Sequence, residues 1–149
     1  MLTLHTADLL AAGGGQPPIP GGAVLVEGDR IVAVGPAEEL AAAHPGARVR
    51  RWPGTLGPAL LHDGPLPAAP TPRERVHALL RLGAGALPSA LVTDPADRAA
   101  ATRSGVLLVP PDFAPPTLRP ATRADLAVFA PAGPCVATIL AGRLLHRRT

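Results

Sequence analysis

The sequence is poor in cysteine and in aromatic residues. Its single cysteine, Cys135, excludes an internal disulfide framework and a cysteine-based metal cluster. Tyrosine is absent, and the aromatic side chains are Trp52, Phe113 and Phe129. Three isolated rings do not make the stacking platform on which proteins bind single-stranded nucleic acid. A fold held together by cysteine bridges and a nucleic-acid partner are therefore both disfavoured.

Lysine is also absent, so all 14 basic residues are arginine. The 11 acidic residues leave a net charge of only +3, which does not require a polyanionic partner. No stretch approaches the roughly 18 apolar residues of a membrane span. The apolar N-terminal stretch has no basic start and is interrupted by Asp8, unlike a secretion signal. We therefore predict a cytoplasmic protein that binds neither nucleic acid nor a membrane.

Glycine and proline, by contrast, account for 36 of the 149 residues, which borders on the composition of disordered chains. The apolar, periodic segments between them nevertheless predict a folded domain with many turns. The clearest segment is 23–36, in which two apolar runs meet at Gly28-Asp29, where glycine can take the positive φ of a tight hairpin turn. Counting back from the turn pairs Glu27 with Arg30, Val26 with Ile31, Leu25 with Val32 and Val24 with Ala33. Both faces of this hairpin are apolar, so both must be covered.

Periodicity and turn signals place the other elements along the chain. Strands are predicted over 1–10, 47–52, 89–92, 106–109, 124–130, 136–140 and 143–146, and helices over 37–43, from Pro72 to a stop at Gly83, and from Pro95 to about Arg103. Loops rich in glycine or proline are predicted over 11–22, 53–70 and 112–123. The succession of strand, helix and strand over 89–109 predicts one right-handed βαβ unit. The hairpin around Ala141-Gly142 echoes the first hairpin, which predicts that the two chain ends meet in one sheet or sandwich.

Both ends of the chain also carry a recognisable pattern. It consists of residues 23–35 (Ala-Val-Leu-Val-Glu-Gly-Asp-Arg-Ile-Val-Ala-Val-Gly) and, in the tail, of 117–120, 124–129 and 141–143. This paired pattern resembles the metal-dependent amidohydrolases, especially the imidazolonepropionase and aminodeoxyfutalosine deaminase branch. In that family the two arms form a composite β-sandwich, and a catalytic TIM barrel lies between them.

The resemblance implies a mixed, β-rich α+β fold, a composite β-sandwich formed by both chain ends. Its arms would be residues 1–66 and 117–149, with a small α/β insertion at 67–116. A TIM barrel needs roughly 200 or more residues. Even when the prolyl loop after the strand at 47–52 and the segment up to Ala124 are counted, only the 72 residues 53–124 are available, which is room for about two βα units of roughly 30 residues each. We therefore predict that the insertion stands in place of a barrel.

The family's metal site is the second departure. The family carries a His-x-His metal pair just after its first arm, and the corresponding run here is 58–66. The ligand positions fall on Gly64 and Leu66, whose side chains cannot bind a metal ion. The family's lysine, later histidines and metal-binding aspartate have no recognisable counterpart downstream. The family uses zinc or iron, but for this chain we predict no metal, no cofactor and no catalytic residue.

Four polar residues remain as candidate ligand-binding groups. His62 and Asp63 lie beside the lost motif, although neighbours on an extended strand point to opposite faces and would not converge on one ion. Asp94 and Asp112 follow the predicted strands of the βαβ unit, where ligands bind in open α/β sheets. For Asp94 the simpler interpretation is a helix cap.

Cys135 would be a nucleophile only beside a histidine. Counting from the Ala141-Gly142 turn pairs Ala137 with His146 and leaves Cys135 beyond that pair. This favours a small buried cysteine at a strand start.

Two groups of arginines would form one basic patch if their strands adjoined. They are Arg48, Arg50 and Arg51, and Arg143, Arg147 and Arg148. Such a patch could hold an anionic partner, but the favoured role is that of edge-strand charges that hinder aggregation.

These observations favour an amidohydrolase-like protein that has lost its metal site and serves as a non-catalytic binding, regulatory or assembly module. The alternative is a hydrolase of non-peptide carbon–nitrogen bonds, acting alone or by completing a site with a partner chain. Either function would involve a small molecule or a protein partner, and a homo-oligomer is compatible with both.

Overall fold

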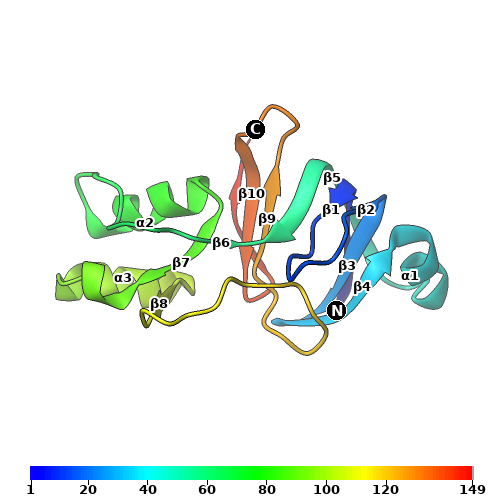
Figure 1. The fold of residues 1–149 in the computed structure, drawn as a ribbon, viewed down its shortest axis with the longest axis horizontal. Helices are drawn as coiled ribbons and strands as arrows, with labels where there is room; N and C mark the ends of the chain where they lie inside the picture. The colour runs from blue at the N-terminus through cyan, green and yellow to red at the C-terminus, as the bar shows by residue number, and fades with distance from the viewer. Residues whose placement is uncertain (149) are drawn as a thin grey trace.

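Eleven strands and three α-helices make up residues 1–148, the part of the chain that the computed structural model describes. The strands are β1 (Leu2–Leu10), β2 (Ile19–Pro20), β3 (Gly22–Glu27), β4 (Arg30–Pro36), β5 (Arg48–Pro58), β6 (Leu60–Leu61), β7 (Ala84–Pro88), β8 (Leu107–Val109), β9 (Leu126–Phe129), β10 (Cys135–Leu140) and β11 (Arg143–Arg147). The helices are α1 (Ala37–Ala43), α2 (Pro72–Arg81) and α3 (Pro95–Ser104), with a 3₁₀ turn, η1 (Ser89–Leu91). They form two lobes that lie side by side along the long axis (Figure 1). The predicted mixed, β-rich fold is confirmed.

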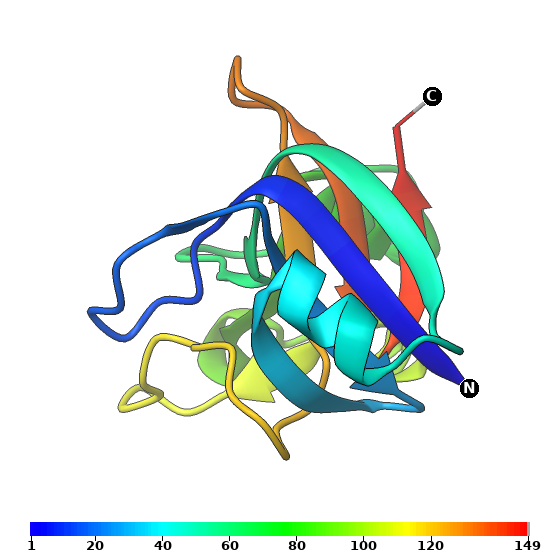
Figure 2. The same cartoon turned by 90° about the vertical axis from the view of Figure 1, so that its right-hand side faces the viewer.

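The larger lobe is one eight-stranded sheet to which both ends of the chain contribute. Its order is β11-β10-β9-β5-β1-β3-β4, and β2 pairs with β1. The tail joins the N-terminal arm where β9 pairs antiparallel with β5, and β5 runs parallel to β1. The sheet curves around a common interior (Figure 2), and Ile31 of β4 exchanges backbone hydrogen bonds with Ala121 and Thr122 in the segment before β9. The predicted meeting of the two ends in one sheet is therefore confirmed.

The first hairpin is covered on both faces, as its apolar pattern requires. Val24 and Val26 point into the main core with residues of β1, β5, β9 and β10. Leu25 faces the other way, into a smaller cluster that Leu40 of α1 helps to cover. The predicted pairs Glu27–Arg30 and Val26–Ile31 are confirmed. Beyond them the prediction is wrong, because a bulge leaves Val32 without a partner and pairs Leu25 with Ala33 and Val24 with Val34.

The smaller lobe is a three-stranded parallel sheet, β6-β7-β8, with helices α2 and α3. Thr71 caps α2 by accepting a hydrogen bond from the Glu74 backbone N–H at 3.2 Å, with Pro72 at the first helical position. A strand–helix–strand unit is present, but its first strand is β7 and not the predicted 89–92, and β6-α2-β7 adds a second unit. Within residues 1–148 these strands do not close into a barrel.

Two of the expected element boundaries are wrong. The strand predicted at 89–92 lies earlier, at β7, and the predicted segment forms η1 instead. Alanine and glycine have low strand propensity, but burial of β7 between two parallel strands overrides it. The strand predicted to end at Trp52 continues to Pro58, because a bulge absorbs Pro53 and Gly54 opposite Asp8. The Asp8 carboxylate accepts the Gly54 N–H at 2.9 Å and holds that bulge in place.

The lobes share a packed junction made by β10. Leu140 points out of the large sheet into the core of the smaller lobe. The Thr138 hydroxyl donates a hydrogen bond of 2.6 Å to the Leu80 carbonyl near the end of α2. Gly85 of β7 lies so close that a Cβ there would be 2.6 Å from Leu140 Cδ2. The insertion is therefore attached to the sandwich through buried contacts.

Replacing Gly54 with alanine should destabilise the protein by more than about 2 kcal/mol. Gly54 has φ +81°, which costs an alanine roughly 1–2 kcal/mol, and its Cβ would run into the Phe129 carbonyl oxygen. The matched control is Gly15→Ala, because Gly15 has φ +77° with nothing within 4 Å of its Cβ position. Urea denaturation of both variants measures the difference. Equal losses would contradict the close packing of β5 on the Phe129 backbone.

None of the helices described is long and apolar enough to cross a membrane.

Candidate functional site

His62 and Asp63 follow β6, at the edge where the smaller sheet leads into its loops. The His62 backbone N–H donates to the Ala86 carbonyl at 2.8 Å, and its Nε2 lies 3.0 Å from the Pro65 carbonyl oxygen. His62 is half-buried and Asp63 is exposed. The histidine therefore stabilises its own loop.

Asp94 caps α3, as its simpler interpretation predicted. Its Oδ1 accepts the Ala96 backbone N–H at 2.8 Å, and Pro95 follows as the first helical residue. Asp112 is exposed in the turn after β8. Within residues 1–148, no hydrogen bond or ion pair joins any two of His62, Asp63, Asp94 and Asp112.

Arg98 closes the loop after β7 at this edge of the sheet. Its guanidinium donates to the carbonyl oxygens of Ser89 at 3.1 Å and Val92 at 2.9 Å, and to the Ser89 hydroxyl at 3.1 Å. These hydrogen bonds connect η1 to α3. Arg98 therefore serves the loop structure at the strand ends where the sequence predicted a ligand crevice.

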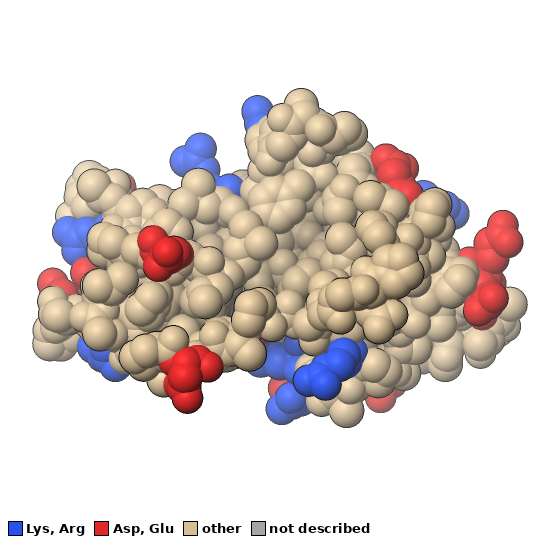
Figure 3. Space-filling model, in the orientation of Figure 1, with Lys and Arg blue, Asp and Glu red and all other residues tan. Residues whose placement is uncertain are grey.

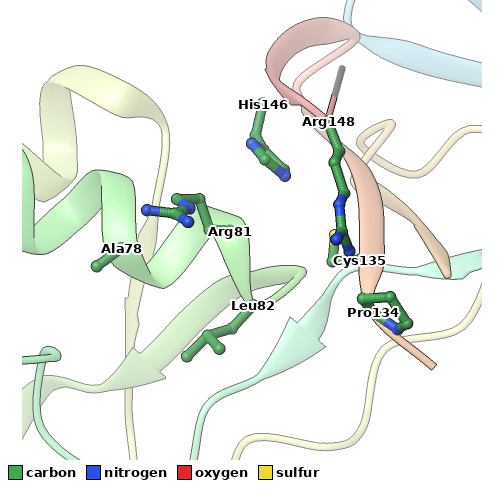
Figure 4. Close-up of a pocket in the computed structure, with 7 residues that line it drawn as sticks. All are labelled: Ala78, Arg81, Leu82, Pro134, Cys135, His146 and Arg148. Carbon is green, nitrogen blue, oxygen red and sulfur yellow. The ribbon is translucent and has the colours of Figure 1, made fainter.

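A different group of side chains converges between the lobes. There a cavity of about 410 Å³ separates the end of α2 from β10 and β11 (Figure 4). We refer to it as the inter-lobe cavity. It is lined by Ala78, Arg81, Leu82, Pro134, Cys135, His146 and Arg148. In Figure 4, Arg81 approaches from the helix, while His146 and Arg148 approach from the tail strand.

Cys135 is buried at the start of β10, as predicted. Its Sγ lies 3.4 Å from both the Ala137 carbonyl oxygen and the Thr138 Oγ1. The predicted pairing of Ala137 with His146 is wrong, because a bulge in the tail hairpin pairs His146 with Thr138. The pairing shift brings the imidazole to the same cavity as Cys135, but no hydrogen bond joins Sγ to a histidine in the described chain. Among residues 1–148 the thiol therefore has no hydrogen-bonded general base.

Basic side chains surround His146 in the inter-lobe cavity. The pKa of His146 is lowered from its usual 6.5, first by burial and then by the charge of His77, with a smaller lowering from Arg81; a hydrogen bond with the Cys135 backbone opposes them. The His77 and His146 rings meet edge to face with their centroids 6.0 Å apart. His146 is therefore neutral at pH 7, in a cavity already bordered by two guanidinium groups.

The two arginine groups adjoin in part. Arg147 of β11 lies over the Trp52 ring, with its Cζ 5.6 Å from the ring centroid, and a shallow hollow joins it to Arg48, Arg50 and Arg51 of β5. Arg148 lines the inter-lobe cavity instead. On the face shown in Figure 3, charges of both signs are scattered over a largely uncharged surface.

Sequence reasoning did not identify Arg81, His77 or Arg148 as members of one site. The sequence does indicate that His146 and Arg148 share a face, because they are two residues apart in an extended segment. Nothing local showed that this face would meet the end of α2, some 65 residues earlier in the sequence.

Comparison with known proteins agrees with this architecture. Residues 22–47 match the family model "Imidazolonepropionase-like composite domain, bacteria". No curated protein sequence gives a significant match to the chain. Among solved structures, E. coli guanine deaminase has a TM-score of 0.54 at 16% identity over 69% of this chain and 34% of that enzyme. Triazine hydrolase from Arthobacter aurescens has a TM-score of 0.50 at 16% identity over 70% of this chain and 34% of that enzyme.

At these identities the two structures establish the fold alone, and the chain spans about a third of their length. The fold is that of a composite β-sandwich with a small α/β insertion. Residues 22–47, which form β3, β4 and α1, also resemble an imidazolonepropionase-like composite domain. The resemblance predicted from the two chain ends is confirmed.

The residues present do not fit the metal centre that the superfamily implies. Gly64 has no side-chain donor, and Leu66 packs against the core of the smaller lobe. Within residues 1–148, no three histidine, cysteine, aspartate or glutamate side chains lie close enough together to hold a metal ion. No reaction step through a metal is therefore derived for this chain.

Proposed function

We propose that this chain is an amidohydrolase-like composite-domain protein that lacks the metal site and acts as a non-catalytic binding, regulatory or assembly module. The observation that carries the proposal is the form of the segment between the two arms. It folds as a three-stranded sheet with two helices and a core of its own. Its strand ends carry loop-forming and helix-capping contacts from His62, Asp94 and Arg98.

The donor chemistry at the family's ligand positions supports the same proposal. Leu66 contributes apolar packing where the family has an imidazole. His62 is the nearest imidazole, and its Nε2 lies against the Pro65 carbonyl. The ligand of such a module is a small molecule or a protein that binds the assembled sandwich and insertion.

Metal analysis combined with hydrolase assays tests this proposal. Purified protein, incubated with zinc or iron(II) and then dialysed, should retain far less than one metal ion per chain by elemental analysis. It should not turn over a cyclic amide or an amino-nucleoside. Matched measurements on His62→Ala should give the same values, because His62 is not a ligand in this proposal. Stoichiometric metal that is lost in His62→Ala, or turnover above the protein-free rate, would instead establish the hydrolase alternative.

A further inference from the structure

Among residues 1–148, the lining of the inter-lobe cavity contains arginine side chains and no acidic side chain. Arg81 contributes one guanidinium from the last turn of α2, and Arg148 contributes another from the segment after β11. The ion pairs within residues 1–148 are Asp29–Arg30, Arg75–Asp97 and Arg123–Asp125. Hence no carboxylate in the described chain lies within 4.0 Å of Arg81 or Arg148. The lining likewise contains no aspartate or glutamate.

Two of the carbonyl oxygens in the last turn of α2 have hydrogen-bond partners. The Leu79 and Leu80 carbonyls accept the backbone N–H groups of Leu82 and Gly83, each at 3.0 Å. The Thr138 hydroxyl also donates to the Leu80 carbonyl. The negative end of the helix is thus partly satisfied, and the Arg81 guanidinium is the full charge at this wall.

His146 provides a third group suited to an anion. Its ring lines the cavity beside Cys135, with His77 and Arg81 facing it from α2 and Arg148 just beyond the end of β11. A neutral imidazole can donate one hydrogen bond, and a bound anion would stabilise the imidazolium form as well.

The remaining lining is apolar. Ala78, Leu82 and Pro134 contribute hydrocarbon surface, and the volume of about 410 Å³ falls in the range of roughly 300–1,000 Å³ that small-molecule sites occupy. The cavity therefore has room for an organic group beside the charged one.

We propose that the inter-lobe cavity binds a small organic phosphate monoester. Its phosphate group would lie between Arg81 and Arg148, with His146 as a further donor, and its organic part would contact Leu82 and Pro134. Two guanidinium groups match a dianionic phosphate in charge and can each form paired hydrogen bonds with its oxygens. This site goes beyond the proposed function, since it does not depend on whether the chain is catalytic.

Calorimetry with glycerol phosphate as the probe tests the site. Wild-type protein should bind it saturably with one site per chain. Arg81→Gln and Arg148→Gln should each weaken binding about tenfold or more, because each removes a charge-assisted pair of hydrogen bonds. The matched control is Arg103→Gln, because Arg103 is also exposed, lies in the last turn of α3 and does not line the cavity; this variant should bind as the wild type does. Both cavity variants change exposed side chains, and circular dichroism should show an unchanged fold.

A second readout is the ionisation of His146 by NMR. Glycerol phosphate should raise the pKa of His146, and the rise should disappear in Arg81→Gln and Arg148→Gln. Absence of saturable binding, or an equal loss in Arg103→Gln, would overturn the site. If succinate binds as tightly as glycerol phosphate does, the assignment to phosphate is overturned. If inorganic phosphate binds as tightly as glycerol phosphate does, the role of the apolar wall is overturned.

Discussion

The free energy of unfolding should fall by about 3 kcal/mol between pH 7 and pH 4 through the titration of a single buried histidine, His5. His5 lies in β1 and is only 5% exposed. Its pKa is lowered from 6.5 to about 4, first by burial and then by the positive charge of Arg50. In the unfolded chain the imidazole regains its usual pKa and binds a proton at a higher pH. The stabilising contribution is therefore complete above pH 6.5 and is lost as the pH falls toward 4.

The hydrogen bond of His5 also makes the folded state less stable at low pH. The Trp52 Nε1–H donates to His5 Nδ1 at 3.1 Å, so that nitrogen must be unprotonated. The two rings are stacked with their centroids 6.4 Å apart, inside the sandwich. Protonation would place two N–H groups against each other and a charge in the core, and both effects favour unfolding.

Urea denaturation at pH 7, 5.5 and 4 measures this loss, with His5→Gln as the control. Glutamine keeps an acceptor for Trp52 but has no proton to gain, so its pH dependence should be shallower by about 3 kcal/mol across the interval. His146, whose pKa is also lowered, is present in both proteins and cancels in the comparison. Parallel curves for the two proteins would show that His5 does not govern the acid sensitivity.

Elements marked by local chemistry could be predicted from the sequence. The Gly28-Asp29 turn, the Thr71 cap with Pro72, and the Asp94 cap with Pro95 each depend on residues a few positions apart. These signals placed the first hairpin, α2 and α3 correctly. The resemblance at the two chain ends then predicted how the ends combine, which periodicity alone did not.

The errors occurred where tertiary contacts override local preference. β5 continues through Pro53 only because a bulge opposite Asp8 absorbs the missing donor. Both hairpins contain a bulge that shifts the pairing by one residue, which moved Val32 and His146 from their expected partners. A bulge has no fixed sequence signature, so counting back from a turn gives the right register only up to the first one.

Binding residues are harder to predict from the sequence than helices and strands. Their sequence neighbours make His62, Asp94 and Asp112 candidate ligand-binding groups, which stays a prediction, and the first two also make loop and cap contacts. The inter-lobe cavity instead joins Arg81 to His146 and Arg148 across the junction of the lobes. Its existence follows from how β10 packs against α2, and no pattern within either segment encodes that contact.

That junction should be essential to the stability of the whole chain, so Leu140→Ala should destabilise the protein by about 2–5 kcal/mol. Leu140 belongs to β10 of the large sheet, is 1% exposed, and is buried in the core of the smaller lobe with Leu79 and Leu87. Truncating it removes apolar contacts between β10 and the smaller lobe and leaves a cavity that the close backbone at Gly85 cannot fill. The control is Leu144→Ala in the same hairpin, which is 37% exposed and should cost less than about 1 kcal/mol.

Denaturation followed by both circular dichroism and Trp52 fluorescence makes the measurement specific. Trp52 reports on the sandwich, whereas most of the helical signal comes from α2 and α3 in the smaller lobe. Because Leu140 joins β10 of the large sheet to the core of the smaller lobe, the two probes should show one coincident transition in the wild type and in both variants, shifted most in Leu140→Ala. Separate transitions for the two probes in the wild type, or equal losses in the two variants, would mean that the insertion folds independently of the sandwich.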